Sequence, residues 1–295
     1  MTRPKDIAII GAGKVGVAIG QLARSAGYTV RAVAGRTSRK TAQAARAIGP
    51  QTNPCTPAEA ARAGQLVLIT VPDDAIETVC CELAAAKAFA PGAVVAHCSG
   101  ALGSDILGTA RQSCRCAVGS MHPLQTFPTV QAAIEKMPGT YFFCEGDETA
   151  VEVLQRLAAD IGGNPVRIDP THKGIYHAAG AMVSNHLVAL LDAALVLGAQ
   201  AGIDRQTYLA ACGPLVRATV DNVVRMGPAA ALTGPIARGD VKTIRRHLDS
   251  LQAAPKELQQ FYKAAAMWTI QVALAKGTID EGTGDTLRGL VSPLD

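Results

Sequence analysis

Three ionisable side chains in the sequence are candidates for proton transfer. Lys173 and His177 lie four residues apart in a segment typical of a helix, and at ~100° per residue Gly180 and Ser184 share their face. Such a polar stripe on an otherwise apolar helix needs partners, which a substrate would supply. His122 follows another apolar segment, although a histidine before a proline also suits a purely structural loop. We expect Lys173 to be the leading proton donor, with His177 and His122 as alternatives or orienting groups.

Three further polar side chains are candidates for substrate binding. Ser99 follows a predicted strand, and Ser184 lies on the face of Lys173 and His177. Arg238 lies in a glycine- and proline-rich turn between two predicted helices, where its guanidinium could approach a substrate carboxylate. The alternative for this turn is a helix start at which Asp240 is the N-cap.

A glycine-rich turn near the N-terminus predicts a dinucleotide site. Gly11, Gly13 and Gly16 form a GxGxxG pattern that follows a predicted strand and opens a predicted helix. The free N–H groups of the first helical turn would hold a pyrophosphate, because the helix dipole favours negative charge there. A glycine-rich turn without a ligand is the alternative. The predicted cofactor-binding residues of the turn are Gly11, Ala12, Gly13, Lys14, Val15 and Gly16.

The end of the second predicted strand indicates which dinucleotide binds. An NAD site usually has an acidic residue there for the ribose hydroxyls, but this sequence has Arg36, followed by Thr37, Ser38 and Arg39. A guanidinium beside hydroxyl groups suits a 2′-phosphate, so we expect NADP. Thr37 or Ser38 could instead, or also, cap the next helix.

A turn after the predicted strand at residues 66–71 completes the predicted cofactor site. Val71 and Pro72 would line the nicotinamide ribose, and we expect Asp73 to be a helix N-cap.

The elements that must position these residues fall into two classes. The first ~165 residues alternate short apolar runs with Ala-rich helical runs, which predicts an α/β domain with a doubly wound, mostly parallel sheet. The predicted strands are residues 7–10, 29–34, 66–71, 94–97, 115–120, 140–144 and 165–168. Beyond residue 169 only helical periodicity is found. We therefore predict a Rossmann domain at residues 1–169 and an all-helical domain at residues 170–295, with the substrate in a cleft between them.

Composition narrows the function classes. The chain has 295 residues, of which 48% are hydrophobic and 18% charged, so a folded protein of two domains is expected. The net charge of +4 does not argue for nucleic acid, although residues 1–46 contain nine Lys or Arg and one acid, which suits an anionic ligand. Eight cysteines without metal-site spacing predict reduced thiols and no metal.

One apolar segment, residues 178–201, is long enough to be mistaken for a membrane span. Because it contains Asn185, His186, Asp192 and Gln200, we interpret it as a buried central helix of a cytoplasmic protein with no membrane partner. Such a helix offers more apolar surface than a small domain covers, which predicts a homodimer through residues 171–295.

The sequence resembles the 6-phosphogluconate-dehydrogenase-like superfamily over essentially its whole length. It looks similar to a bacterial family of Rossmann-like NADP oxidoreductases with a C-terminal helical domain of unknown function. The segments that carry this resemblance are residues 122–127, 172–177 and 232–240.

Better-known relatives of that superfamily imply roles for single residues. Lys173 matches the general acid of β-hydroxyacid dehydrogenases and ketopantoate reductases, whose following Asn is replaced by His177. His122 and Ser99 resemble a His and a Ser of prephenate dehydrogenases. Pyrroline-5-carboxylate reductases and deazaflavin-dependent NADP oxidoreductases have a similar first domain.

These observations together predict an NADP(H)-dependent oxidoreductase. Its substrate would be a small carboxylate-bearing oxo, hydroxy or imine compound. The alternatives are a non-catalytic NADP-binding sensor or scaffold, and an enzyme like prephenate dehydrogenase or ketopantoate reductase.

Overall fold

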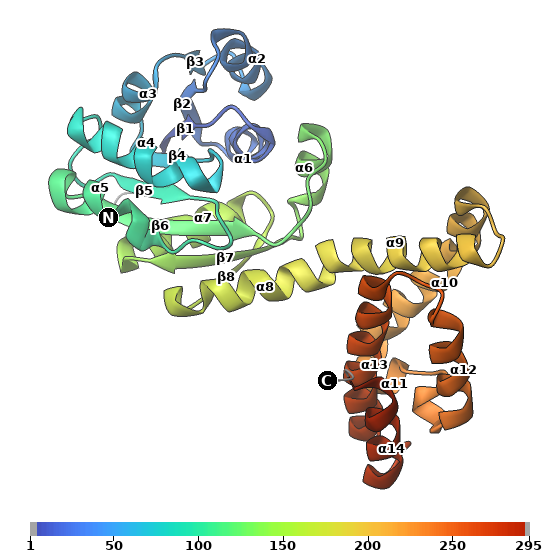
Figure 1. The fold of residues 1–295 in the computed structure, drawn as a ribbon. Helices are drawn as coiled ribbons and strands as arrows, with labels where there is room; N and C mark the ends of the chain where they lie inside the picture. Colours follow the sequence, from blue (N-terminus) through green and yellow to red (C-terminus); the bar gives the residue numbers. More distant parts are fainter. Residues whose placement is uncertain (1–4, 293–295) are drawn as a thin grey trace. The chain divides into compact units, whose positions relative to one another are not determined.

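The computed structural model describes residues 5–292, and the chain forms two compact units, Met1–Asn185 and His186–Asp295 (Figure 1). The helix that begins at Lys173 therefore belongs to the unit that contains the sheet. The candidate residues up to Ser184 all lie in the first unit, and Arg238 lies in the second.

The first unit is built on one eight-stranded sheet with the order β3-β2-β1-β4-β5-β6-β7-β8. All neighbouring strands pair in parallel except β6 and β7, which are antiparallel. The first six strands have the order of a doubly wound Rossmann-like sheet, so the predicted fold class is confirmed. The strands are β1 (Asp6–Ile10), β2 (Thr29–Ala34), β3 (Asn53–Pro54), β4 (Leu66–Ile69), β5 (Val94–His97), β6 (Ala117–Pro123), β7 (Tyr141–Gly146) and β8 (Asn164–Arg167).

Helices cover both faces of this sheet. Because side chains alternate along a strand, Ile7 and Ile9 of β1 pack in one buried cluster while Ala8 and Ile10 pack in the other. Two cores of this kind explain why the strand sequences are continuously apolar. The helices of this unit are α1 (Lys14–Ser25), α2 (Ser38–Ile48), α3 (Pro57–Ala63), α4 (Asp73–Ala85), η1 (Ser104–Leu107), α5 (Gly108–Cys114), α6 (Val130–Lys136), α7 (Glu148–Asp160), η2 (Pro170–His172) and α8 (Lys173–Val183).

The ends of β6 differ from the prediction. The strand runs from Ala117 to Pro123, so His122 lies on the strand, opposite Phe143 of β7, and not in a loop after it. Antiparallel pairing with β7 extends β6 beyond the point where its parallel pairing with β5 stops at Ser120. His122 is therefore held by a ladder of backbone hydrogen bonds, which fixes it more firmly than a loop would.

The reversal between β6 and β7 also sets the position of α8. Since β7 and β8 run against the other strands, the chain leaves β8 at the edge opposite the carboxyl end of β6. Helix α8 then runs back along the sheet. Its first residue, Lys173, lies beside Ser120 in the middle of β6, and Tyr176 lies beside His122 near the end of that strand.

The second unit contains only helices in its described part, as predicted from the periodicity. Its core contains Ile236, Ile244, Ile270 and Leu287, while Trp268 on α13 is 72% exposed. The elements are α9 (Asn185–Gln200, which begins at the last residue of the first unit), α10 (Arg205–Met226), α11 (Pro228–Ala231), η3 (Ile236–Arg238), α12 (Val241–Leu251), α13 (Lys256–Lys276) and α14 (Glu281–Val291).

The prediction of a buried central helix is wrong for the single chain. Residues 170–200 form the one helical stretch in the described chain that is long and apolar enough to cross a membrane by length and composition, but only 6% of the most apolar window is buried. Met182, Val183 and Val188 are each more than 60% exposed. Apolar composition shows what a helix is able to bury, whereas its burial depends on what surrounds it.

All eight cysteines are free.

Candidate functional site

A continuous series of contacts joins the glycine turn to the candidate histidines along the carboxyl edge of the sheet. The Thr70 hydroxyl, just after β4, donates a hydrogen bond of 2.9 Å to the carbonyl of Gly11 after β1. Asp73 accepts one of 2.7 Å from the Ser99 hydroxyl after β5. Gly100, the next residue, lies directly against the rings of His122 and His177. This edge is where ligands bind in open α/β sheets.

The glycine turn is shaped as a ligand cradle requires. Gly11 has a φ of +125°, and a Cβ atom there or at Gly16 would come within 2.6 Å of the Thr70 carbonyl or the Gly11 carbonyl, respectively. A Cβ atom on Gly13 would meet nothing closer than 4.0 Å, so this position faces open space. Gly13 is also the N-cap of α1, and no side chain caps the N–H groups of the first turn. These groups are available to an anion.

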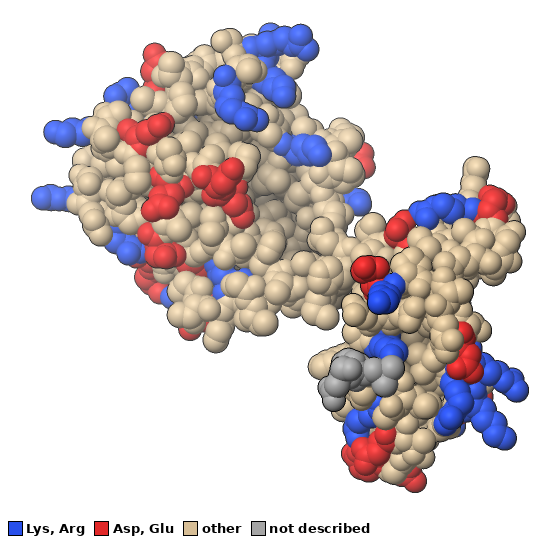
Figure 2. All heavy atoms as spheres, viewed as in Figure 1, with Lys and Arg blue, Asp and Glu red and all other residues tan. Residues whose placement is uncertain are grey.

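The residues predicted to select the cofactor follow β2 at the same edge. Arg36, Ser38 and Arg39 are exposed, and Figure 2 shows Lys and Arg side chains gathered over α2. Thr37 is the N-cap of α2 and accepts a hydrogen bond of 3.4 Å from the backbone of Lys40, as the capping alternative anticipated. Arg36 is thus exposed and directly follows Gly35, at which a Cβ atom would lie 2.9 Å from Ala12 of the glycine turn.

The turn after β4 differs from its prediction in one residue. Pro72 is the N-cap of α4, and Asp73 is the first helical residue, with no capping hydrogen bond from a side chain. The Asp73 carboxylate instead binds Ser99. Ser99 is 6% exposed, and its hydroxyl also accepts hydrogen bonds from the backbones of Ala101 and Leu102. One donor and two acceptor positions are thereby all used, so the hydroxyl holds the turn together.

His122 is the centre of a cluster of rings. Its Nδ1 lies 2.8 Å from the Tyr176 hydroxyl, and its ring centroid is 6.0 Å from that of His177. Tyr176 in turn packs on Phe143, with a centroid distance of 4.4 Å. A Cβ atom on Gly100 would lie 2.8 Å from Nε2 of His122 and 2.7 Å from Cδ2 of His177, so glycine is what allows the rings to approach this turn.

Burial lowers the pKa of His122 to about 4, and the positive charges of Lys173 and His177 contribute in the same direction. His122 is therefore neutral at neutral pH. Burial also lowers the pKa of His97 to about 4, but both of its nitrogens are engaged, with the backbones of Ser99 and Gly103. His97 therefore stabilises the loop and His122 is the more accessible base.

Lys173 occupies an enclosed position. It is 1% exposed, and its Nζ donates hydrogen bonds of 2.8 Å to the Ser99 carbonyl and 2.6 Å to the Ser120 hydroxyl. The carboxylate of Glu145 on β7 lies 3.7 Å away. Burial lowers the pKa of the Lys173 ammonium, and the charge of Glu145 opposes that effect. In this conformation the amino group points into the sheet unit.

Glu145 is the hub of this buried cluster. Its carboxylate, on a side chain that is fully buried, accepts hydrogen bonds from the backbone and hydroxyl of Ser104 and from the hydroxyl of Ser120. No buried side-chain nitrogen or oxygen in residues 5–292 is left without a partner. The network therefore neutralises the Lys173 charge by one ion pair and several hydrogen bonds.

The remaining predicted residues are placed as follows. Ser184 lies half-buried between α8 and α9, one turn beyond Gly180. Arg238 is exposed at the end of η3 in the helical unit, and Asp240 is the N-cap of α12 through Thr243, as the structural alternative anticipated. Asp192 binds Arg205 of α10, which agrees with a structural role.

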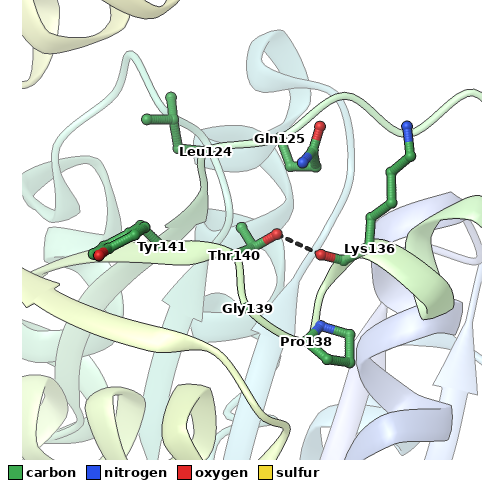
Figure 3. Close-up of a pocket in the computed structure, with 7 residues that line it drawn as sticks. All are labelled: Leu124, Gln125, Lys136, Pro138, Gly139, Thr140 and Tyr141. Atoms are coloured by element: carbon green, nitrogen blue, oxygen red, sulfur yellow. Dashed lines mark hydrogen bonds between the residues drawn. The ribbon is translucent and has the colours of Figure 1, made fainter. Parts of the chain in front are cut away.

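An open hollow of about 450 Å³ lies beside the carboxyl end of β6 and the start of β7 (Figure 3). Leu124, Tyr141 and Lys136 are among its lining residues, and its floor includes the hydrogen bond from Thr140 to the Lys136 carbonyl. It contains none of the candidate residues predicted from the sequence.

Sequence reasoning missed four members of the site: Asp73 as a partner of Ser99, Gly100, Tyr176 and Glu145. Glu145 had a signal, because a single acid within an apolar strand requires a buried partner. Tyr176 lies within residues 172–177, which carry the family resemblance, but no role was predicted for it. The contact of Gly100 with two histidines depends on the pairing of distant segments and has no local signal.

Two family models match the chain. Residues 2–123 match the Rossmann-like domain, and residues 140–269 match a domain of unknown function, DUF2520. The first part of the chain is thus similar to a Rossmann-like domain, and a later segment is similar to the DUF2520 domain. The comparison with curated proteins gives no match.

Solved structures show the same fold across nearly the whole chain. A protein from Thermotoga maritima has a TM-score of 0.71 at 24% identity, covering 92% of this chain and 99% of its own. An imine reductase from Pseudomonas sp. has a TM-score of 0.57 at 16% identity, with coverages of 98% and 92%. A reductive aminase from Aspergillus terreus, in complex with NADPH and ethyl-5-oxohexanoate, has a TM-score of 0.57 at 18% identity, with coverages of 98% and 93%.

Proposed function

We propose that this chain is an NADP(H)-dependent oxidoreductase that acts on a small oxo, hydroxy or imine compound, with a carboxylate on the substrate. The observation that carries the proposal is the series of contacts from Gly11 through Thr70, and from Asp73 through Ser99 and Gly100, to His122. It brings an anion cradle and a half-buried titratable group to one edge of one sheet.

The residues of the first unit fit the dinucleotide. The open face of Gly13 and the uncapped N–H groups of α1 suit a pyrophosphate, and exposed Arg36 suits a 2′-phosphate. Val71 and Pro72 lie in the short segment between the end of β4 and the start of α4 at Asp73. This position suits contact with the nicotinamide ribose. When bound, the nicotinamide exchanges a hydride with the substrate carbon. Structures of similar fold include an enzyme in complex with NADPH, which supports this choice.

We place the proton transfer at His122. As a neutral imidazole it accepts a proton from a hydroxyl or amine in the oxidative direction, while Tyr176 holds its Nδ1. In the reductive direction His122 must first be protonated, and it then gives the proton to the oxygen or nitrogen whose carbon receives hydride. A substrate carboxylate nearby favours the protonated form, because negative charge raises the pKa of a histidine. His177 is the neighbouring alternative.

An imine acceptor agrees with the names of two structural neighbours, an imine reductase and a reductive aminase. The sequence departs from β-hydroxyacid dehydrogenases at His177, so an imine is the first class to test.

The test is NADPH oxidation against a panel of cyclic imines and 2-oxo acids. For any compound that reacts, His122→Gln should reduce turnover by ~10²–10⁴-fold and leave NADPH affinity nearly unchanged. In the unsubstituted protein the reductive rate should rise as the pH falls below neutral, because more His122 is protonated. The exposed His186 provides the matched control, and His186→Gln should retain full turnover.

A chain that binds NADPH but oxidises it with no member of the panel would favour the sensor alternative. If the His122→Gln variant retained full turnover, His122 would not be the proton-transfer group, and the role would be assigned to His177 or Lys173.

A further inference from the structure

The buried cluster around Lys173 joins five separate segments. Lys173 opens α8, Ser99 follows β5, Ser120 lies on β6, Glu145 on β7 and Ser104 opens η1. Every polar contact of the Lys173 ammonium is made within the first unit. The cluster is therefore the polar junction between α8 and the sheet.

A gain in folding stability does not by itself explain why a buried ion pair is present here. Removing two charges from water costs as much as their attraction returns, and well-packed apolar residues in place of a buried ion pair are often neutral or stabilising. A buried lysine fixed by three groups does, however, define one register of its helix. One turn after Lys173, that register presents Tyr176 and His177 to His122 and Gly100.

We propose that Lys173 is a positioning residue of this site: its bonds to Ser99, Ser120 and Glu145 fix the first turn of α8 so that Tyr176 and His177 pack against His122. This inference rests on the proposed function, since it assigns Lys173 to the geometry and charge of the reacting group and not to contact with the substrate.

The ammonium of Lys173 also acts on His122 through space. It is the largest charge effect on that ring after burial itself, and it lowers the pKa. His177 and His97 act in the same direction, whereas Asp73 opposes them. If Lys173 only anchored the helix and had no electrostatic effect on His122, the pKa of His122 would not depend on Lys173. The titration of His122 therefore distinguishes a purely structural role from the proposed positioning role.

The experiment measures His122 directly, by NMR titration of protein labelled with ¹³C at histidine Cε1. His122→Gln assigns its signal among the six histidines. The test variant is Lys173→Met with Glu145→Gln, which removes both charges and leaves no lone buried carboxylate. We expect the His122 midpoint to rise from about 4 by about 1 pH unit.

Hydrogen–deuterium exchange of the same variant tests the positioning. Amides in the first turns of α8 should exchange about tenfold faster or more, while those of β1 keep their protection. Lys136→Met, which removes an exposed ammonium from the same unit, is the matched control and should alter neither measurement. Ser120→Ala keeps both charges, and it should speed exchange in α8 while retaining the low midpoint.

An unchanged His122 midpoint, or unchanged exchange in α8, overturns the proposal. If the double variant does not fold, Ser120→Ala decides alone: faster exchange restricted to α8 supports the positioning role, and unaltered exchange refutes it. Neither measurement needs a substrate. Failure of the NADPH assay would therefore count against the proposed function without changing this result.

Discussion

Charged side chains at the two ends of the site are in opposite environments. Arg36 is exposed at the end of β2, whereas Lys173 and Glu145 are enclosed. An exposed guanidinium is able to bind a phosphate without reorganising the protein, and the enclosed ammonium of Lys173 acts electrostatically on His122. The first suits ligand recognition and the second suits control of local structure.

The position of Arg36 leads to a prediction about cofactor preference. NADPH should bind more tightly than NADH, and Arg36→Ala should narrow the difference by ~1–3 kcal/mol, because a charge-assisted hydrogen bond to the 2′-phosphate is lost. Isothermal titration of both cofactors measures the difference. Arg46→Ala, on the exposed last turn of α2, is the control and should preserve it. Equal affinities in the unsubstituted protein would contradict the assignment.

At the scale of elements, two glycines of the turn between β1 and α1 have different roles. Gly16 is required for close packing, whereas Gly13 leaves space for a ligand. Gly16→Ala should lower the free energy of unfolding by about 1–3 kcal/mol, because its Cβ would meet the Gly11 carbonyl and the Thr70 hydroxyl. Gly13→Ala should change stability by less than about 1 kcal/mol but weaken NADPH binding about tenfold or more, because its Cβ enters the space for the pyrophosphate.

Thermal unfolding and cofactor titration of the two variants measure both effects. Normal NADPH affinity in a folded Gly13→Ala variant would show that the cofactor does not approach this turn.

Most elements that carry the site could be predicted from sequence, because apolar strands and a glycine turn are local patterns. The end of β6 could not, since its last residues pair with β7, a strand that lies some twenty residues further on. The same holds for the partners of Lys173. Helical spacing predicted that Lys173 and His177 share a helix, and both lie on α8, but Ser120 and Glu145 come from other strands. The capping box that Thr56 and Glu59 form at the start of α3 is another local pattern of this kind.

At the scale of the whole molecule, several large apolar side chains are exposed in the single chain and would be stabilised by burial in an interface. Val224, Trp268 and Leu215 are each at least two-thirds exposed on helices of the second unit. Large apolar side chains exposed on a single chain are often covered in protein–protein contacts. We predict a homodimer formed mainly through residues 171–295, as the sequence suggested.

Light scattering at micromolar concentration measures this assembly. Val224→Asp should shift the protein toward the monomer, because an unpaired carboxylate is costly in an apolar contact. Tyr141→Asp, at an exposed aromatic residue of the first unit, should leave the dimer intact. A monomer in the unsubstituted protein would refute the prediction.

The exposed indole on α13 has an optical consequence. Trp268 is the one tryptophan of the chain, so tryptophan emission comes from the helical unit alone and the sheet unit contributes none. Reduced nicotinamides absorb where indoles emit. Energy transfer from Trp268 to a cofactor bound at the glycine turn would therefore serve as a molecular ruler between the two units, with no added dye and no substitution.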